Sequence, residues 1–111
     1  MKPIQYFVRE NTWLKNTHHG WGNGYVAIPS GHPLFKKDYK EIEKKYNLNV
    51  HGGISFTGDA GLVPDCPNCL DGYWMIGFDT THDGDNFDNW DMDAVITETM
   101  NLLEQCQKIT K

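Results

Sequence analysis

Residues 74–85 read Trp-Met-Ile-Gly-Phe-Asp-Thr-Thr-His-Asp-Gly-Asp, an apolar run that passes directly into a polar segment. An apolar, aromatic run of this length is typical of a buried β-strand. Its end at Asp79 marks the point where the chain leaves the core, and loops at such points often carry functional groups. We therefore expect a strand over residues 72–79, followed by an acidic loop that reaches Asn89.

The other elements are predicted from residue patterns on either side of this strand. β-Forming residues indicate further strands over residues 4–9, 24–29 and 48–57, the last with a kink at its paired glycines. Apolar positions three and four apart predict a short helix over residues 38–46. A longer amphipathic helix begins near Met92 and has one buried stripe. That stripe consists of Val95, Ile96, Met100, Leu103, Cys106 and Ile109.

The order strand, strand, helix, strand, strand, helix predicts an α+β fold. We expect a single domain, residues 1–111, in which the strands form a small antiparallel sheet of about four strands. The short helix and the longer C-terminal helix would cover one face of the sheet. Asp91 and Asp93 stand at the start of the long helix and Lys108 and Lys111 at its end, as the helix dipole favours.

Composition excludes several function classes. The chain has 111 residues, of which 39% are hydrophobic and 23% charged, as in a globular domain, and its 13% aromatic content can supply binding surface. A net charge of −5 argues against non-specific nucleic-acid binding, because that binding needs cations. The first residues lack the apolar region of an export signal, and no apolar run approaches the roughly 20 residues of a membrane span. We therefore expect a cytoplasmic protein with reduced cysteines and neither nucleic acid nor membrane as a partner.

Several phrases resemble a family of small proteins encoded by tailed bacteriophages and their prophages. They are GYVAIP at 24–29, GHPLF at 31–35, VHGGISF at 50–56, WMIGFDTTHDGD at 74–85 and LLEQ at 102–105. The HGG and GFDxxHxGD phrases are the most specific. The resemblance implies expression in the cytoplasm of an infected bacterium and candidate functional positions at these phrases, but it implies no particular reaction.

The GFDxxHxGD phrase contains a candidate metal site. Aspartate oxygens and an imidazole suit Zn, Mn or Fe, so Asp79, His82 and Asp85 are candidate ligands, and His51 would add a second nitrogen. Alternatively, both aspartates cap turns while His82 makes a structural hydrogen bond. His51 with Asp79 would also suit general acid–base chemistry, although no nucleophile motif accompanies them. A calcium loop of the EF-hand type fails, because its twelfth position is Trp90.

Two glycine-rich segments are candidates for holding an organic ligand. Gly52 and Gly53, beside His51, would let the backbone approach a phosphate or ribose closely, or they form a β-bulge. Trp21 and Tyr25 would stack on a ring of the ligand, or Trp21 merely anchors a surface loop. The remaining tryptophans are expected in the core: Trp13, Trp74 and Trp90.

The cysteines give a weaker signal. Cys66-Pro67-Asn68-Cys69 resembles half of a zinc knuckle, which a histidine or Cys106 would complete. The alternative is an unpaired, redox-inert pair. Cys106 falls on the buried stripe of the last helix, where a thiol behaves as a small hydrophobe.

These observations favour a non-enzymatic small-molecule binder, with no catalytic residue and no cofactor. By analogy with phage counter-defence proteins, the expected ligand is a nucleotide-derived immune signal that the protein sequesters as a sponge. The expected ligand-binding residues are Trp21, Tyr25, His51, Gly52, Gly53, Asp79, His82 and Asp85.

The alternatives are a metal-dependent hydrolase of a small phosphoester or nucleotide and an inhibitor of a host protein. In the hydrolase, His51, Asp79, His82 and Asp85 would hold a divalent metal. A homodimer or a higher homo-oligomer is also expected, since small open sheets often associate to cover apolar surface.

Overall fold

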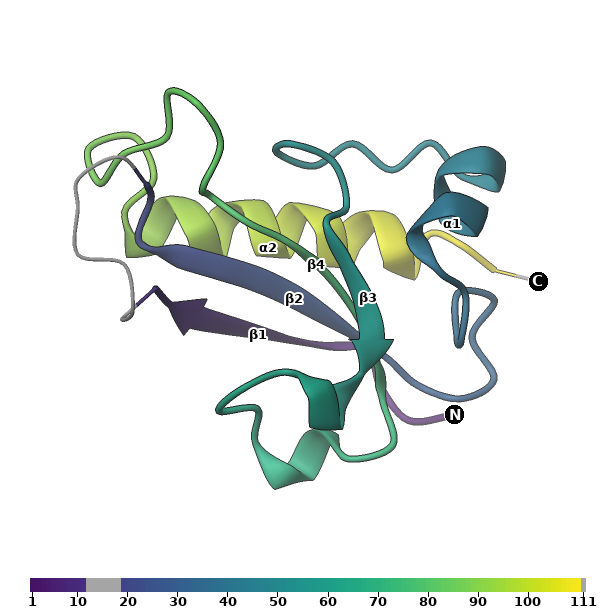
Figure 1. Cartoon of the computed structure of the whole chain (residues 1–111). Helices are drawn as coiled ribbons and strands as arrows, with labels where there is room; N and C mark the ends of the chain where they lie inside the picture. Colours follow the sequence, from purple (N-terminus) through teal and green to yellow (C-terminus); the bar gives the residue numbers. More distant parts are fainter. Residues whose placement is uncertain (12–18, 111) are drawn as a thin grey trace.

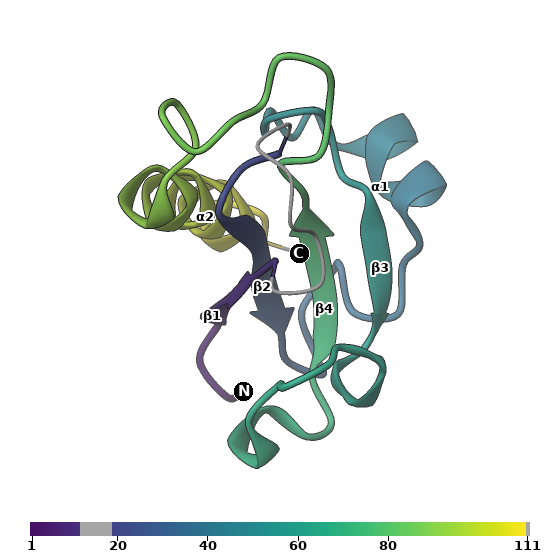
Figure 2. The same cartoon turned by 60° about the vertical axis from the view of Figure 1, so that its left-hand side comes forward.

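Four strands form one antiparallel sheet in the computed structural model, which describes residues 1–11 and 19–110. The strands are β1 (Gln5–Glu10), β2 (Gly22–Ile28), β3 (Phe56–Asp59) and β4 (Trp74–Phe78). Their order across the sheet is β1-β2-β4-β3 (Figure 2), and every neighbouring pair is antiparallel. With helices α1 (Tyr39–Lys45) and α2 (Met92–Gln107), this arrangement confirms the predicted single α+β domain (Figure 1).

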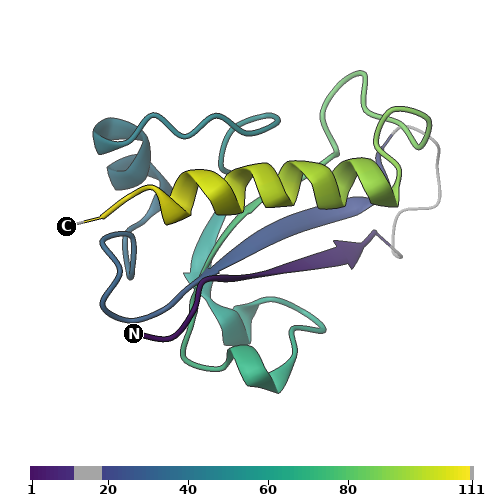
Figure 3. The same cartoon turned by 180° about the vertical axis from the view of Figure 1, so that it is seen from behind.

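Helix α2 lies across one face of the sheet and sets the position of the main core (Figure 3). Its buried residues are Val95, Thr99, Leu102 and Cys106. Apart from Thr99, they belong to one cluster with Val26 and Ile28 of β2 and Ile76 and Phe78 of β4. The predicted stripe was therefore wrong in part: Ile96, Leu103 and Ile109 are only half-buried and Met100 is 42% exposed.

The shift of this stripe has a physical cause in strand β2. A Cβ on Gly24 would collide with the Thr99 hydroxyl and the Phe78 ring, so only glycine lets the helix approach β2 this closely. The buried Thr99 hydroxyl donates to Val95 O at 2.7 Å and is therefore satisfied without water. A polar residue thus occupies a core position, which an apolar pattern does not reveal.

Both ends of α2 agree with the sequence expectation. The Asp91 carboxylate caps the first turn by accepting from Ala94 N–H at 2.9 Å, and Asp93 lies within that turn. Lys108 is the C-terminal capping residue. Lys111 lies outside the described residues. Within the described part of the chain, neither helix is long and apolar enough to cross a membrane.

Helix α1 confirms the predicted short helix. A capping box starts it, in which the Asp38 side chain accepts from Glu41 N–H and the Glu41 side chain accepts from Asp38 N–H. Ile42 is its only buried residue and joins the same core cluster as α2. Both helices therefore cover the same face of the sheet.

The second face of the sheet is covered by a connection rather than by a helix layer. Between β3 and β4 the chain forms two short 3₁₀ turns, η1 (Ala60–Leu62) and η2 (Asn68–Leu70). A second buried cluster lies beneath them and consists of Tyr25, Ala27, Ala60, Val63, Leu70, Tyr73 and Met75.

The predicted strand over residues 48–57 was too long. Strand β3 begins only at Phe56, and the preceding residues 50–53 form a turn closed by Gly53 N–H donating to Val50 O at 2.8 Å. Gly52 has φ +70° and Gly53 φ +79°, a left-handed backbone that interrupts strand pairing. The paired glycines therefore mark a turn and not a β-bulge.

Candidate functional site

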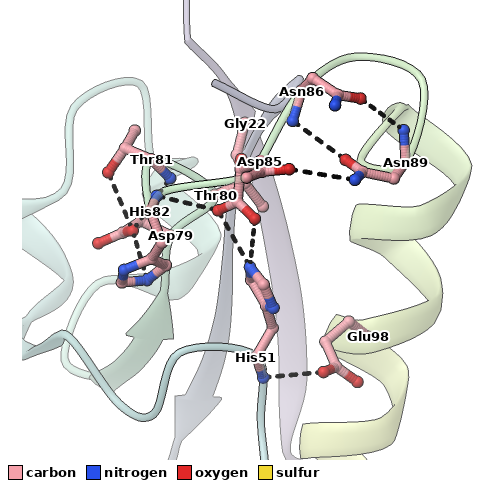
Figure 4. A network of polar contacts seen from close by, with 11 residues as sticks. Gly22, His51, Asp79, Thr80, Thr81, His82, Asp85, Asn86, Asn89 and Glu98 are labelled. Atoms are coloured by element: carbon pink, nitrogen blue, oxygen red, sulfur yellow. Dashed lines mark hydrogen bonds and ion pairs between the residues drawn. The ribbon is translucent and has the colours of Figure 1, made fainter. Parts of the chain in front are cut away.

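The candidate site lies where β4 ends, in the loop of residues 79–90 that leads into α2 (Figure 4). The chain entering β2 holds both ends of this loop. Gly20 N–H donates to Thr80 O, and Trp21 N–H donates to Trp90 O, each at 2.7 Å. Because the sheet fixes the loop at two points, the polar side chains between them have defined positions.

Asp85 is the buried centre of the site. Its side chain is 4% exposed, and both carboxylate oxygens lie within hydrogen-bond distance of His51 Nε2, at 2.9 and 3.0 Å. Asp85 also accepts from the backbone N–H of His82 at 2.9 Å. A carboxylate only accepts, so His51 carries its proton on Nε2. Asp85 thus joins the turn of residues 50–53 to the loop after β4.

Two further contacts fix His51. Its ring stacks on Trp90, with ring centroids 4.1 Å apart and an interplanar angle of 35°. Its backbone N–H donates to Glu98 on α2 at 2.8 Å, and Glu98 in turn accepts from the Asn101 amide at 2.9 Å. The imidazole is therefore held from three directions, as a binding or proton-transfer group must be.

The second imidazole is paired with the second aspartate. His82 Nε2 lies 3.0 Å from Asp79 Oδ1, an ion-pair distance, although the two groups are not aligned as a hydrogen bond. We therefore describe this contact as electrostatic. The same Asp79 oxygen accepts from the backbone N–H and the hydroxyl of Thr81, at 3.2 and 3.0 Å. Asp79 thus caps a turn, as the structural interpretation of the sequence expected.

Gly52 places the two halves of the site in contact. A Cβ at this position would collide with the His82 ring, and φ of +70° disfavours any residue with a side chain. The two imidazoles then lie edge to face, with centroids 5.5 Å apart and planes at 77°. Gly53 makes no comparable close approach to the rings, and its N–H is used within the turn.

One nitrogen of each ring lies outside the contacts made by the described residues. The side chain of His51 is 25% exposed and that of His82 40% exposed. Among the described residues, hydrogen bonds and ion pairs engage Nε2 of both rings and Nδ1 of neither. The two imidazoles, each beside a carboxylate, thus lie edge to face, and these contacts use neither Nδ1 atom.

The sequence predicted histidine–aspartate contacts at the site, but it predicted the wrong aspartate for His51. The sequence pointed to His51 with Asp79, whereas His51 pairs with Asp85, and Asp79 lies beside His82. Trp90 was assigned to the core, where it does pack, but it also supports His51. No local sequence signal identifies this second role, because the contact joins residues far apart in the chain.

Of the two predicted stacking residues, Tyr25 lies on the face of the sheet away from the imidazoles, and Trp21 contacts the loop through its backbone N–H. Trp21 is half-buried against the main core cluster. Tyr25 is 8% exposed on the second face, where its ring stacks on Phe7 at 6.2 Å and meets Phe56 edge-on at 5.8 Å. Burial raises the pKa of the Tyr25 hydroxyl. The aromatic ring that lies next to His51 is that of Trp90.

The remaining tryptophan predictions have separate outcomes. Trp74 is half-buried against the main core cluster, as expected, and its indole N–H donates to Lys37 O at 2.8 Å. Trp13 lies outside the described residues.

Metal ligation would need side chains that converge. Among residues 1–11 and 19–110, no three His, Cys, Asp or Glu side chains are arranged to hold one ion. Cys66 packs on the second face, while Cys106 is buried under α2 on the first, so the sheet separates Cys106 from the Cys66–Cys69 pair. Burial raises the pKa of Cys66 and raises that of Cys106 to about 12.

The charged side chains of the loop and of the first turn of α2 are acidic. No Lys or Arg occurs between Lys45 and Lys108. The loop and the first turn of α2 carry six carboxylates, at Asp79, Asp83, Asp85, Asp88, Asp91 and Asp93. The imidazoles are therefore the only basic side chains that this part of the sequence brings to the site, which limits the negative charge that a ligand can carry.

Comparison with protein-family models, with curated proteins and with solved structures found no match. The resemblance to phage proteins therefore stays a prediction from the sequence phrases. The chemistry of the site rests on its own geometry.

Proposed function

We propose that the protein binds a small nucleotide-like molecule at the His51–His82 pair and holds it without converting it. The observation that carries this proposal is the pair of carboxylate-backed imidazoles, 5.5 Å apart, whose Nδ1 atoms have no hydrogen-bond partner among the described residues. Two fixed imidazoles whose ring centroids lie 5.5 Å apart suit a ligand with several hydrogen-bonding groups close together.

The aspartates act on the ligand through the histidines. Asp85 holds the proton of His51 on Nε2, so Nδ1 of the neutral ring accepts a hydrogen bond from a ribose hydroxyl or a base N–H. When the ring is protonated, the same atom donates to an anionic oxygen. Trp90 keeps the ring in place, which lowers the entropy lost on binding.

The local charge refines the ligand class. Because the region between Lys45 and Lys108 has carboxylates and no Lys or Arg, a polyphosphate would be repelled. We therefore expect recognition of the sugar and base, with few phosphate charges. This expectation narrows the nucleotide-derived signal to molecules of low charge.

A sponge role follows if the ligand is bound and not transformed. Among the described residues, no serine or cysteine is hydrogen-bonded to either imidazole, so the site lacks an activated nucleophile of the usual type. Together with the phage-like sequence phrases, this favours sequestration of an immune signal in the cytoplasm of an infected bacterium.

The test is calorimetric titration of adenosine, AMP, ADP-ribose and a cyclic dinucleotide into protein without a polyhistidine tag. We expect saturable binding that weakens about 10-fold to 100-fold in His82→Ala, the loss expected for one hydrogen bond to an ionised or polarised group. Tyr39→Ala, an exposed aromatic change on α1, is the matched control and should bind normally.

Ligand recovery separates the proposal from the alternatives. Intact ligand released by heating the complex supports sequestration. Converted ligand, or stoichiometric Zn or Mn that is lost in His82→Ala, would instead support the metal-dependent hydrolase. Equal binding by wild type and His82→Ala would refute the proposed site.

A further inference from the structure

Strand β1 forms an open edge of the sheet. It pairs with β2 alone among the described strands and has no bulge across its register. Asn11 N–H donates to Trp21 O at 2.8 Å, and in this register the two residues are directly opposite. The alternation of antiparallel bonding then turns the backbone groups of Tyr6, Val8 and Glu10 away from β2. Edge strands are usually protected by charged side chains, Pro or a bulge. Gln5–Glu10 contains no Lys, Pro or bulge, and its two charged residues, Arg9 and Glu10, stand at the end of the strand.

An exposed apolar surface lies beside this edge. Helix α2 contacts both β1 and β2 and runs alongside β1 (Figures 1 and 3). The flank of α2 towards the site is polar, and its Glu98 and Gln105 are bonded to residues 49–51. The helical period places three apolar residues on a different side of the helix, the exposed Met92 and Met100 and the half-buried Ile96.

Tyr6 extends this apolar surface onto the strand. Ile4 and Val8 pack on the main core, so the intervening Tyr6 points to the same face as α2. Tyr6 and Met100 are each 42% exposed, and Met92 is 48% exposed. Exposed side chains of this size, next to unpaired backbone groups, are typical of an interface.

We propose that this surface, made of β1 and the apolar side of α2, is the interface of a homodimer. The two β1 strands pair antiparallel around a two-fold axis beside Tyr6, and the sheet continues through both copies. Strands pair at about 4.8 Å. Because α2 lies over β1 and β2, the two α2 axes then come about 10 Å apart, the spacing of packed helices.

Charge complementarity favours a second copy over another partner. In this arrangement the two α2 helices are antiparallel and Met100 lies near the axis. The exposed Asp93 at the start of one helix then approaches the exposed Lys108 at the end of the other. Asp93 of each copy thus meets Lys108 of the other, twice per dimer, as an isologous interface requires. This inference does not depend on the ligand site, which uses the opposite, polar flank of α2.

Sedimentation over a range of protein concentrations tests the dimer. We expect twice the chain mass of 12.7 kDa, and a dissociation constant raised at least about 100-fold by Met100→Glu, which places two carboxylates at the axis. Leu62→Glu, a change at a residue 69% exposed on the η1 turn, is the matched control and should dimerise normally. Circular dichroism establishes that each variant is folded.

A charge swap and hydrogen exchange keep the proposal testable if Met100→Glu does not fold. Lys108→Glu should weaken the dimer several-fold, and adding Asp93→Lys should restore it. The amide protons of Tyr6 and Val8 should be protected at high concentration and exchange freely on dilution. A monomer at all concentrations, or exchange of these amides that does not vary with concentration, would overturn the proposal.

Discussion

Replacing Asp85 by asparagine removes one charge from the centre of the site and almost no volume. The asparagine can keep the contact to the His82 N–H through its remaining oxygen. Its amide N–H groups, however, cannot accept from His51 Nε2, which now lies 2.9 and 3.0 Å from the two carboxylate oxygens. The variant therefore loses a charge-assisted hydrogen bond at a position that is 4% exposed.

The expected magnitude follows from that single contact. A hydrogen bond to a charged group contributes about 1.5–3 kcal/mol, and a neutral replacement recovers about 1 kcal/mol at most. We therefore expect Asp85→Asn to lower the free energy of unfolding by about 1–2 kcal/mol. For a domain of this size, that corresponds to a decrease in Tm of roughly 5–10 °C.

Urea unfolding of Asp85→Asn beside Asp79→Asn provides the measurement. Both variants change an aspartate next to a histidine, but the Asp79 and His82 side chains are 27% and 40% exposed, so solvent screens their contact. We expect Asp79→Asn to cost under about 1 kcal/mol. If the two variants are equally stable, or if Asp85→Asn unfolds like wild type, the assignment of Asp85 as the buried centre is wrong.

Two further predictions concern backbone conformation and thiol chemistry. Gly52→Ala should destabilise the protein by more than Gly72→Ala. Both glycines have positive φ, but only at Gly52 would an added Cβ collide with a neighbouring side chain, that of His82. Thermal melting of the two variants measures the difference. Cys69 should react first with a thiol reagent in the native protein, and Cys106 only after unfolding. Burial raises the pKa of Cys106 from 9.0 to about 12, so the stability that the buried neutral thiol contributes is complete below pH 9 and is lost as pH rises towards 12. In alkaline unfolding, the free energy of unfolding should therefore fall more steeply with pH in wild type than in Cys106→Ala.

The architecture could be predicted from the sequence because its elements obey local rules. Apolar runs bounded by turn residues marked β1, β2 and β4, and the aspartate cap with its helical period marked α2. The errors arose where one residue overrode the pattern. Gly52 and Gly53 ended a predicted strand through their positive φ, and Gly24 brought a threonine into the core.

The sequence predicted four residues that do come together at the site, but it did not predict their pairing, and it wrongly added Tyr25, which lies on the other face of the sheet. His51, Asp79, His82 and Asp85 do gather at the end of β4, as expected for polar groups that follow a buried strand. Which histidine meets which aspartate depends on the turn of residues 50–53 and the loop after β4 meeting in space. Long-range contacts of this kind have no signature in residue spacing.

The strand order also has a consequence for how the chain folds. β4 lies between β2 and β3, yet residues 29–73 separate it from β2 along the chain, so the central pairing closes a long loop. The β2 residues Val26 and Ile28 share their core cluster with Val95 and Leu102 of α2, so this cluster is complete only once α2 has docked. We therefore expect folding to be slow and concerted, because its central contacts join segments that are far apart in the chain. The His51–Asp85 contact, which needs β4 in place, would be among the last interactions to form.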